Sequence, residues 1–357
     1  MSKINIKPSI LIALREASGY SPLEVAKKLG VSVQKINNVE RGKDFFTLTQ
    51  IKKLADIYSR PLAAFFTDKV PKLPTLPDYR INRERRLTPE VYLAQRRAFY
   101  LSRKIAELSN KKSKIPSFPK GLSTKELANR FRKYLGVDLL KQKKADEILD
   151  YYKKILEEKL SMAIIEYPLK AEGVRAFCIF SDISVIVLNE NDETPIKLFS
   201  LFHEIYHLLK KTSAICSIDV EHERQPRIEF HCDRFAAEFL VPTNDLIEEI
   251  KKTGVDNKGI SKLSKIYGVS KQVIMLRLLK LGLVSRDRYR QFKEKFDKEK
   301  LKTKKTGRRK WDRVFFNRVG NFAAQEVSNA YRKGDITFLE SAEILNLKTN
   351  YAEKIIG

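Results

Sequence analysis

Histidine is scarce in this chain, and its distribution is uneven. The 357 residues contain only His203, His207, His222 and His231, all within a stretch of 29 residues. Imidazole is the commonest metal ligand in proteins. A scarce residue type gathered in one segment therefore marks that segment as the first place to look for a metal site.

Cysteines and long apolar runs are also few. Cys178, Cys216 and Cys232 form no C-x-x-C pair and no even-numbered framework, which excludes a disulfide scaffold and fits a reducing compartment. The N-terminus has no apolar stretch of the kind a signal peptide needs, and no window approaches the roughly 18 uncharged apolar residues of a membrane helix. We therefore expect a soluble, cytoplasmic protein without membrane contact.

Acidic residues are outnumbered by basic ones. The chain has 44 Asp and Glu against 70 Lys and Arg, a net charge of +26. Such an excess favours a polyanionic partner, most simply DNA, although high lysine usage can also be a habit of a whole proteome. With 43% hydrophobic residues the chain can form real cores, and its length predicts two or three domains.

The histidine segment begins with an H-E-x-x-H motif. Within the apolar stretch Leu198–Leu209 lies His203-Glu204-Ile205-Tyr206-His207. Residues i and i+4 of a helix project from one face, so both imidazoles can reach the same ion. Glu204 lies beside them, toward the water that would complete the coordination. The spacing predicts a metal site on a helix.

Catalytic zinc usually has three protein ligands, and the best candidate for the third is Glu229. It lies in the segment Ile228–Pro242, whose apolar residues have helical spacing and which proline ends. Asp233 shares a helix face with Glu229 and could accept the outer N–H of a ligating histidine. Rival ligands that the sequence leaves open are Cys232, His231 and His222.

The alternative to a metal site is a chance motif on a packed helix, with histidines satisfied by ordinary hydrogen bonds. The second carboxylate-bearing helix downstream argues against it. Structural zinc sites are closed and usually rich in cysteine, whereas two histidines and one glutamate leave a fourth position for water. The sequence thus indicates a catalytic type of zinc site.

These features resemble the ImmA/IrrE family of metallopeptidases. The resemblance rests on the apolar lead into His203-Glu204-Ile205-Tyr206-His207 and on Glu229-x-x-Cys232-Asp233-x-Phe235-Ala236-Ala237-x-x-Leu240-x-Pro242. It implies a gluzincin-like fold, one Zn²⁺ bound by His203, His207 and Glu229, and Glu204 as the catalytic base. The family usually has Asn where this chain has Asp233. In related systems such peptidases cleave a partner repressor and so derepress genes.

An oxyanion stabiliser is also expected in such an enzyme. His222, His231 and Tyr206 are unranked candidates. The polar segment Lys210–Arg227, which we expect to be irregular, could form a wall or lid of the cleft. Strands are expected at Met162–Tyr167, Val174–Phe180 and Ser184–Asn189. By resemblance the last of them flanks the cleft, and an edge strand of this sheet could pair with an extended peptide.

Residues 8–68 predict a set of short helices. Ser21-Pro22 is a favoured start of a helix, Gly30 makes a turn, and Ser32 caps a second helix, Val33–Glu40. Two helices joined by a tight glycine turn are typical of a helix-turn-helix. A small helical bundle used for protein contact is the alternative.

This stretch resembles the Cro and phage-repressor (XRE) type of helix-turn-helix. The match runs through Leu14-Arg15-Glu16, Leu23-Glu24-Val25-Ala26, Leu29-Gly30-Val31-Ser32, Ile36 and Glu40-Arg41-Gly42. It implies that Val33, Gln34, Asn37 and Asn38 face the major groove, where Gln and Asn suit adenine. Lys35, Arg41 and Lys43 would contact phosphates. Pro22 departs from the family, which often has Gln there. One such unit binds weakly, so a homodimer is expected.

The fold class expected is α+β and mostly helical. We expect a helix-turn-helix domain at 1–68, a proline-containing linker and basic helix at 69–122, a zinc peptidase domain at 123–250, a helical extension at 251–296, and a basic linker with C-terminal helices at 297–357. The extension repeats a helix-turn-helix pattern around Gly268. The resemblance to ImmA/IrrE proteins implies that this pattern packs against the peptidase core, and a second DNA-reading unit is the alternative.

The sequence supports three functional hypotheses. The first is a DNA-bound regulator, associated with the nucleoid, whose zinc endopeptidase cleaves a repressor, another partner protein or the chain itself. The second is a transcription factor whose peptidase-like domain senses a metal or ligand without cleaving anything. The third is a toxin–antitoxin or prophage-type regulatory partner. Intact His203, Glu204 and His207 argue against a decayed enzyme.

Overall fold

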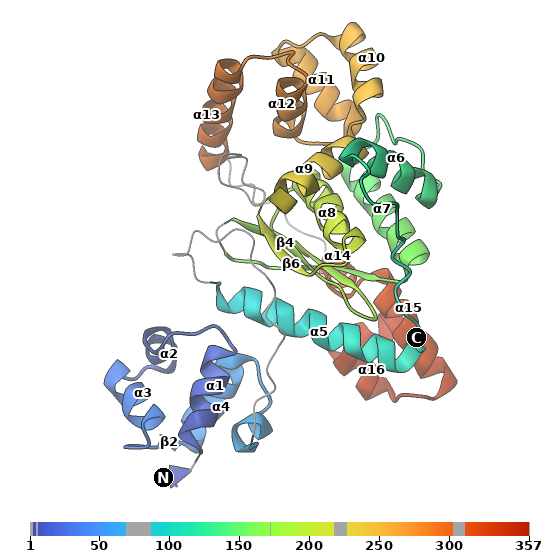
Figure 1. Cartoon of the computed structure of the whole chain (residues 1–357). Helices are drawn as coiled ribbons and strands as arrows, with labels where there is room; N and C mark the ends of the chain where they lie inside the picture. Colours follow the sequence, from blue (N-terminus) through green and yellow to red (C-terminus); the bar gives the residue numbers. More distant parts are fainter. Residues whose placement is uncertain are drawn as a thin grey trace. The chain divides into compact units, whose positions relative to one another are not determined.

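The computed structural model describes residues 3–4, 6–68, 87–171, 173–217, 227–302 and 311–356. The linker expected at 69–80, the candidate residue His222 and positions 303–310 of the basic run lie outside these described residues. The chain divides into two compact units (Figure 1). One comprises Met1–Thr75, Ile81–Phe99 and Lys170–Glu172, and the other Leu76–Arg80, Tyr100–Leu169 and Gly173–Gly357.

The N-terminal unit is a bundle of short helices. Its elements are α1 (Pro8–Glu16), α2 (Pro22–Leu29), α3 (Val33–Glu40), α4 (Leu48–Tyr58) and the 3-10 helix η1 (Leu62–Phe66), with an antiparallel ribbon of β1 (Lys3–Ile4) and β2 (Phe46–Thr47). Apolar side chains from every helix meet in one core, including Leu14, Val25, Ile36, Ile51 and Phe65. The predicted short-helix bundle is confirmed.

The turn between α2 and α3 has the expected helix-turn-helix construction. Ser21 and Glu24 form a capping box, and Ser32 caps α3 by accepting a hydrogen bond from the backbone of Lys35. Gly30 ends α2 with a φ of +78°, a conformation that costs glycine little. The predicted boundaries of α3 are confirmed residue for residue.

A buried ion pair fixes α3 to α1. Arg15 donates through Nε and Nη2 to the two carboxylate oxygens of Glu40, at 2.6 and 3.0 Å, and through Nη1 to the carbonyl of Tyr20 at 2.9 Å. A two-pronged guanidinium–carboxylate contact sets orientation as well as distance. It holds the outer face of α3 at a defined angle to the bundle.

Helix α5 (Pro89–Ser109) lies in the stretch 69–122, where a linker and a basic helix were expected. Its first half belongs to the N-terminal unit, where Arg96 donates to the carbonyl of Tyr58 at 2.7 Å and to Ser18 at 3.2 Å. Its second half belongs to the other unit, where Ser102 donates to the carbonyl of Ile183 at 2.7 Å. The basic helix expected after the linker is thus packed along its length.

The second unit contains a four-stranded sheet in the order β3-β5-β4-β6. Its strands are β3 (Ala163–Tyr167), β4 (Val174–Ile179), β5 (Val185–Asn189) and β6 (Ala214–Ser217). β3 runs parallel to β5, and the other two pairs are antiparallel. The three predicted strands are confirmed. β6 was not predicted, because it lies in a stretch expected to be irregular.

The strand order limits which strands could pair with an extended peptide. β5, which by resemblance was to flank the cleft, pairs with β3 on one side and β4 on the other, and all its residues are buried. It has no edge to offer an added peptide. Among the described strands the edges of this sheet are β3 and β6.

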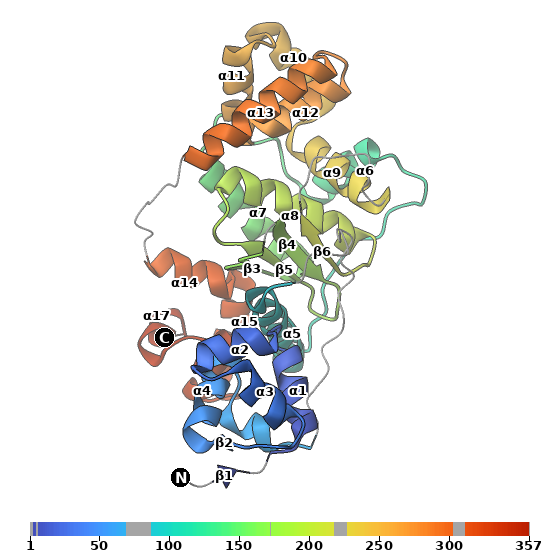
Figure 2. The ribbon, with the colours of Figure 1, turned by 90° about the vertical axis from the view of Figure 1, so that its left-hand side faces the viewer.

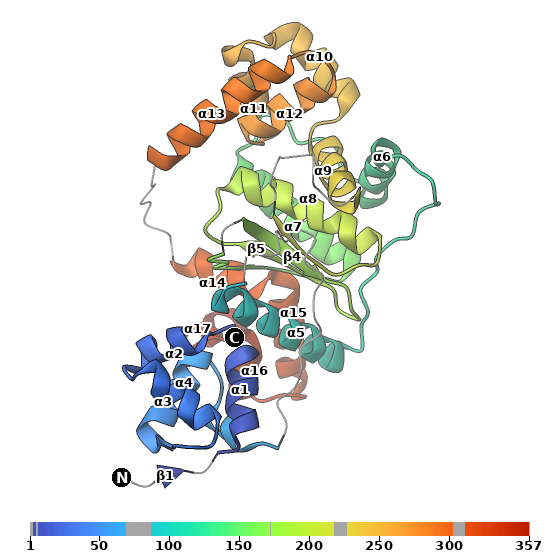
Figure 3. The ribbon, with the colours of Figure 1, turned by 60° about the vertical axis from the view of Figure 1, so that its left-hand side comes forward.

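Helices cover the sheet. α8 (Thr194–Leu209) packs on β4 and β5, with α7 (Ala145–Leu160) beside it (Figure 2). α9 (Arg227–Leu240) packs against α8 and, on its other side, against α6 (Thr124–Leu135), as Figure 3 shows. The second half of α5 lies on the opposite side of the sheet from α8. The largest core of this unit lies between the sheet and these helices.

After α9 the chain continues as α10 (Thr243–Thr253), α11 (Asn257–Tyr267), α12 (Lys271–Lys280) and α13 (Arg286–Lys302). α11 and α12 form the second helix-turn-helix expected around Gly268. The equivalent of the DNA-reading helix is α12, and its residues from Val273 to Leu278 are all buried. This helix therefore packs in the core, as the family resemblance implied, and is not available to read DNA.

The C-terminal region forms α14 (Trp311–Val319), α15 (Asn321–Lys333), α16 (Phe338–Leu345) and α17 (Thr349–Ile356). α14 and α15 pack against β3. Between them Gly320 has a φ of +80°, and a Cβ there would meet the carbonyl oxygen of Ile164 at 2.9 Å, so the close approach requires glycine. Within the described residues no helix has the length and apolar content that crossing a bilayer takes.

Candidate metal centre and nucleic-acid interface

The motif helix α8 is buried on every side. Its residues from Leu198 to Leu208 are all buried, as expected for a helix that is apolar all round. The polar side chains in this setting include His203, Glu204 and His207, each at most 1% exposed. Because burying polar groups is costly unless they find partners, their surroundings indicate what they do.

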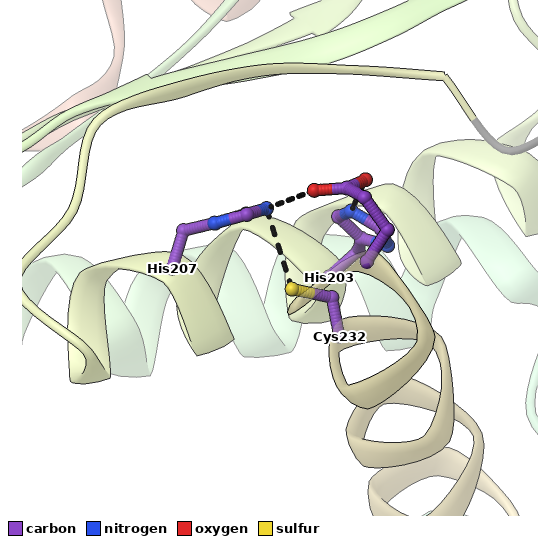
Figure 4. A group of neighbouring side chains, drawn as sticks. His203, His207 and Cys232 are labelled. Atoms are coloured by element: carbon purple, nitrogen blue, oxygen red, sulfur yellow. Dashed lines mark hydrogen bonds and ion pairs between the residues drawn. The ribbon is translucent and has the colours of Figure 1, made fainter. Parts of the chain in front are cut away.

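The two imidazoles converge on one carboxylate. Nε2 of His203 lies 3.2 Å from Oε2 of Glu229, and Nε2 of His207 lies 3.1 Å from Oε1 of the same residue. Figure 4 shows the two histidines of α8 directed toward the end of α9. The structure thus brings together the three residues predicted as ligands, from two helices. Their assignment as metal ligands stays a prediction.

The outer nitrogen of each histidine has its own oxygen partner. Nδ1 of His203 lies 2.9 Å from Oδ1 of Asp233, the contact predicted from the sequence. Nδ1 of His207 lies 3.4 Å from Oγ1 of Thr212, in the turn after α8, which the sequence analysis did not single out. Such partners fix the tautomer and leave Nε2 to bind an ion.

Glu204 is fully buried next to this group. Neither of its carboxylate oxygens makes a hydrogen bond of ordinary geometry to a described residue. Burial raises the pKa of Glu204, while the charges of His207 and His203 and a weak contact with the Cys178 thiol oppose the rise. A buried carboxylate without firm partners is costly unless something else occupies the space it faces.

The charges of the ligand group are strongly coupled in the protein without metal. Burial alone would lower the pKa of His203, but its hydrogen bonds with Asp233 and Glu229 outweigh this and raise the pKa to about 10. Burial alone would raise the pKa of Glu229, and the two histidines instead hold it well below its ordinary value. A cation is therefore favoured between these carboxylates, either a proton on imidazole or a metal ion.

A fourth group belongs to the same cluster. Sγ of Cys232 lies 3.3 Å from Nε2 of His207, as drawn in Figure 4. The ligand atoms of His203, His207, Glu229 and Cys232 all lie within 4.8 Å of one another. Of the rival ligands named from the sequence, Cys232 is therefore in place.

The remaining candidates are placed differently. His231 is outside the four-residue cluster and stacks on the ring of Tyr206, with centroids 6.5 Å apart. Burial raises the pKa of Tyr206 to about 12. His222 lies outside the described residues. The choice of oxyanion stabiliser among these three stays a prediction.

The donor set fits a zinc ion. Zn²⁺ takes imidazole nitrogen, carboxylate oxygen and thiolate sulfur in tetrahedral geometry. The two histidines, the carboxylate of Glu229 and the Sγ of Cys232 each offer one ligand atom within 4.8 Å of the others, and the buried carboxylate of Glu204 lies on the same helix as the histidines. The residues present therefore suit a single divalent ion of this kind.

Contacts along α9 fix the helix that carries Glu229. The rings of Phe202 and Phe239 stack with centroids 3.9 Å apart and join α9 to α8. Arg132 donates to the carbonyl of Phe239 at 2.8 Å, and Arg277 donates to the carboxylate of Glu238 at 2.6 Å. Since these contacts come from α6, α8 and α12, the ligand helix is fixed from three sides.

The face of α3 predicted to read DNA is open to solvent. Gln34 is exposed, and Val33, Asn37 and Asn38 are partly exposed. Gln34 donates to the side-chain oxygen of Asn38 at 3.2 Å. Polar amides on the open face of the second helix are the arrangement used for reading base edges. Their role in DNA reading stays a prediction.

The three basic residues predicted to contact phosphates differ in whether their side chains already have a partner among the described residues. Arg41 and Lys43 are exposed at the end of α3. Lys35 instead forms an ion pair with Asp44, with Nζ 2.6 Å from the carboxylate. Contact of Lys35 with a phosphate would therefore compete with a bond already made.

Comparison with known protein families gives one match in the N-terminal helix-turn-helix unit and a second in the unit that contains the candidate metal centre. Residues 11–64 match the family model of a helix-turn-helix domain, and residues 157–279 match that of the IrrE N-terminal-like domain of the M78 peptidases. No curated protein matches the chain. The second match extends from the end of α7 through α12, so the buried helix-turn-helix lies within it. The chain is a fusion of an XRE-like helix-turn-helix domain with an IrrE/ImmA-like domain of a peptidase family.

Proposed function

We propose that this protein is a DNA-binding regulator whose second domain is a zinc-dependent endopeptidase. Its substrate would be a partner protein such as a repressor, or the chain itself. One observation carries the proposal: the imidazoles of His203 and His207 meet the carboxylate of Glu229 at 3.2 and 3.1 Å, beside the buried carboxylate of Glu204. The match to a peptidase family supports it.

In this proposal His203, His207 and Glu229 hold one Zn²⁺. Bound there, the ion would supply Lewis acidity to a peptide carbonyl and to water. Asp233 keeps His203 in the tautomer that presents Nε2, and Thr212 faces the outer nitrogen of His207. Both contacts prepare the site before the metal arrives.

Glu204 would act as the proton carrier. Burial raises its pKa, which makes its carboxylate a better proton acceptor than an exposed glutamate. It would take a proton from water and pass it to the leaving amine. β6 follows Thr212 and is an edge strand among the strands that the structure describes, so an extended peptide could add to the sheet there.

The N-terminal domain would bring this chemistry to DNA. The exposed face of α3 would lie in a major groove, and Arg41 and Lys43 would contact the backbone. Two half-sites bound by a homodimer would give the affinity that one unit lacks. Sedimentation of the full chain with and without a bound duplex tests the dimer.

The test of the peptidase compares wild type with Glu204→Gln. We expect about one zinc per chain in both proteins, and cleavage of a protein encoded beside this gene by wild type alone. Loss of a general base typically slows a reaction about 10²- to 10⁴-fold. Equal regulatory output from the two proteins would exclude proteolysis as the mechanism.

A second function is favoured by one specific contact. The Sγ of Cys232, 3.3 Å from Nε2 of His207, would occupy the position that a catalytic zinc site leaves open. A closed site of this kind suits a metal-sensing transcription factor that cleaves nothing. The two functions differ in whether any condition opens the site.

A further inference from the structure

Cys232 belongs to the hydrophobic core of the second unit, and its thiol also contacts one of the three residues proposed as metal ligands. It follows Glu229 by three residues on α9, so the two side chains lie on the same face one turn apart. Its side chain is fully buried, and its Sγ faces Nε2 of His207, the atom that would bind the metal. The geometry places the thiol among the atoms that would surround the metal.

Three of the separations within the cluster are close to those of a tetrahedral shell. Zinc bonds of about 2.3 Å to sulfur and about 2.0–2.1 Å to nitrogen and oxygen, at tetrahedral angles, separate sulfur from nitrogen by roughly 3.5 Å and nitrogen from oxygen by roughly 3.4 Å. The observed separations are 3.3 Å for Sγ to Nε2 of His207, and 3.1 and 3.2 Å for the two nitrogens to Glu229. Small outward shifts would admit the ion.

Cys178 provides a comparison within the same unit. It is as fully buried as Cys232 and also lies near the site, but its Sγ faces the carbonyl of Thr212 at 3.7 Å and is not part of the ligand cluster. Buried cysteines commonly act as small apolar residues. Burial alone therefore does not account for the position of Cys232.

We infer that Cys232 is the fourth protein ligand of the metal, and that the resting site is a closed shell of two histidines, one glutamate and one cysteine. As the sulfur–metal bond forms, the thiol proton leaves to solvent. Glu204 then lies beside a shell without a water molecule. This inference rests on the proposed zinc site and adds its regulation: the peptidase is latent until the thiolate leaves the ion.

A closed shell also explains why a cysteine accompanies the two histidines and the glutamate. Four protein ligands are typical of structural zinc, and three with an open position are typical of catalytic zinc. A four-ligand shell that can lose one protein ligand would change from the structural type of site to the catalytic type. If the open state is populated at about 0.1–10%, as is common for minor states, removing Cys232 raises the competent fraction at least ~10-fold.

The experiment uses the full chain loaded with Co²⁺ in place of zinc, and the variants Cys232→Ser and Cys232→Ala. We expect wild type to show a near-ultraviolet thiolate-to-cobalt charge-transfer band, and both variants to bind cobalt without it. Cys178→Ala is the matched control and should keep the band. X-ray absorption of the zinc form should show one sulfur at about 2.3 Å in wild type and none in either variant.

The readouts separate the two proposals. If wild type binds neither Co²⁺ nor Zn²⁺, or if His203→Ala with His207→Ala binds as well as wild type, the proposed zinc site is wrong. If wild type binds one ion but lacks the charge-transfer band and the zinc–sulfur distance, the site stands and the role of Cys232 is overturned. Circular dichroism and thermal midpoints establish that each variant is folded. Faster cleavage of the protein encoded beside this gene by Cys232→Ala than by wild type would support latency. An equal rate of cleavage would contradict it.

Discussion

Oδ1 of Asp233 lies 2.9 Å from Nδ1 of His203, one helical turn beyond Glu229 on the same helix. A carboxylate behind an imidazole ligand fixes the ring and raises its basicity toward the metal. The ImmA/IrrE pattern to which this chain is similar usually has asparagine at that position. This chain therefore has an additional negative charge directly behind His203, one of the proposed metal ligands.

Asp233→Asn should weaken zinc binding without abolishing it. The amide oxygen can still accept the Nδ1–H of His203, but it lacks the charge, so the loss should fall within or below the usual 10- to 100-fold range for such partners. Competition with a chromophoric chelator measures the affinity. Asp233→Ala removes the acceptor as well and should bind more weakly still. Equal affinities for the two variants would show that the hydrogen bond plays no part.

Arg277→Met should destabilise the second unit. Arg277 is 6% exposed and Glu238 is 4% exposed, and the bond between them joins α12 to the ligand helix α9. Removing one partner of a buried ion pair strands the other charge, at a cost of about 3–5 kcal/mol. The urea midpoint followed by circular dichroism measures the change.

Two controls accompany Arg277→Met. Glu238→Gln in the same chain should recover part of the loss, because no buried charge is then left over. Lys154→Met breaks an exposed pair with Glu158, at 3.9 Å, and should change stability little. An Arg277 variant as stable as the Lys154 variant would contradict the role given to the buried pair.

Local pattern was enough to predict that His203 and His207 lie together on one helix of the proposed metal site. The spacing of His203 and His207 places them on one face of any helix, and the apolar residues around them predict that helix. Glu229 required a further assumption, because nothing in the spacing of residues 203 and 229 determines how α8 and α9 cross. The resemblance to a family supplied that information, and the contacts of Phe202 with Phe239 supply the physical reason.

The strand β6 and the order of strands in the sheet were not predicted, because both depend on pairing between residues far apart in the sequence. β6 is four residues long, Ala-Ile-Cys-Ser, too short for an alternating pattern to stand out, and it exists through its pairing with β4. The order of strands likewise places β5 in the middle of the sheet, a fact no local propensity encodes. The burial of α12 could have been predicted locally. In the run from Val273 to Leu279 every residue except Arg277 is apolar.

The pH dependence of stability should show a contribution from Glu157. Burial raises its pKa from 4.5 to about 7, against the opposing charge of Lys153 and hydrogen bonds that include one from the backbone of Ile164. The folded state thus holds the proton more tightly than the unfolded state does. The stabilisation is present below pH 4.5 and is lost as the pH rises to about 7, by roughly 3 kcal/mol in all.

Glu157→Gln isolates this contribution, because it keeps the shape of the protonated side chain and cannot ionise. Unfolding free energies of wild type and variant should be close at about pH 4 or below. The variant should then become the more stable of the two by pH 8. A difference that stays constant between these pH values would show that Glu157 is not protonated in the folded protein.

DNA reading should depend on α3 and not on α12. Gln34 follows the capping residue Ser32 by two positions and is exposed, and Gln272 follows Ser270 by the same interval in the buried helix-turn-helix. The probe is a duplex selected by the full chain from a random library. Gln34→Ala should cost about 1–3 kcal/mol on that duplex and relax its sequence preference, because a bidentate amide contact with a base is lost.

Two variants complete this test, with fluorescence anisotropy as the measurement. Lys43→Ala should weaken binding to the selected duplex and to an unrelated one alike, and reduce the slope of log affinity against log salt by about 1. Gln272→Ala should bind both duplexes as wild type does, because the neighbouring Met275 and Leu276 are buried and α12 cannot enter a groove. Equal losses from Gln34→Ala and Gln272→Ala would mean that the open face of α3 does not read the sequence, and the DNA-binding surface would then have to lie elsewhere on the chain.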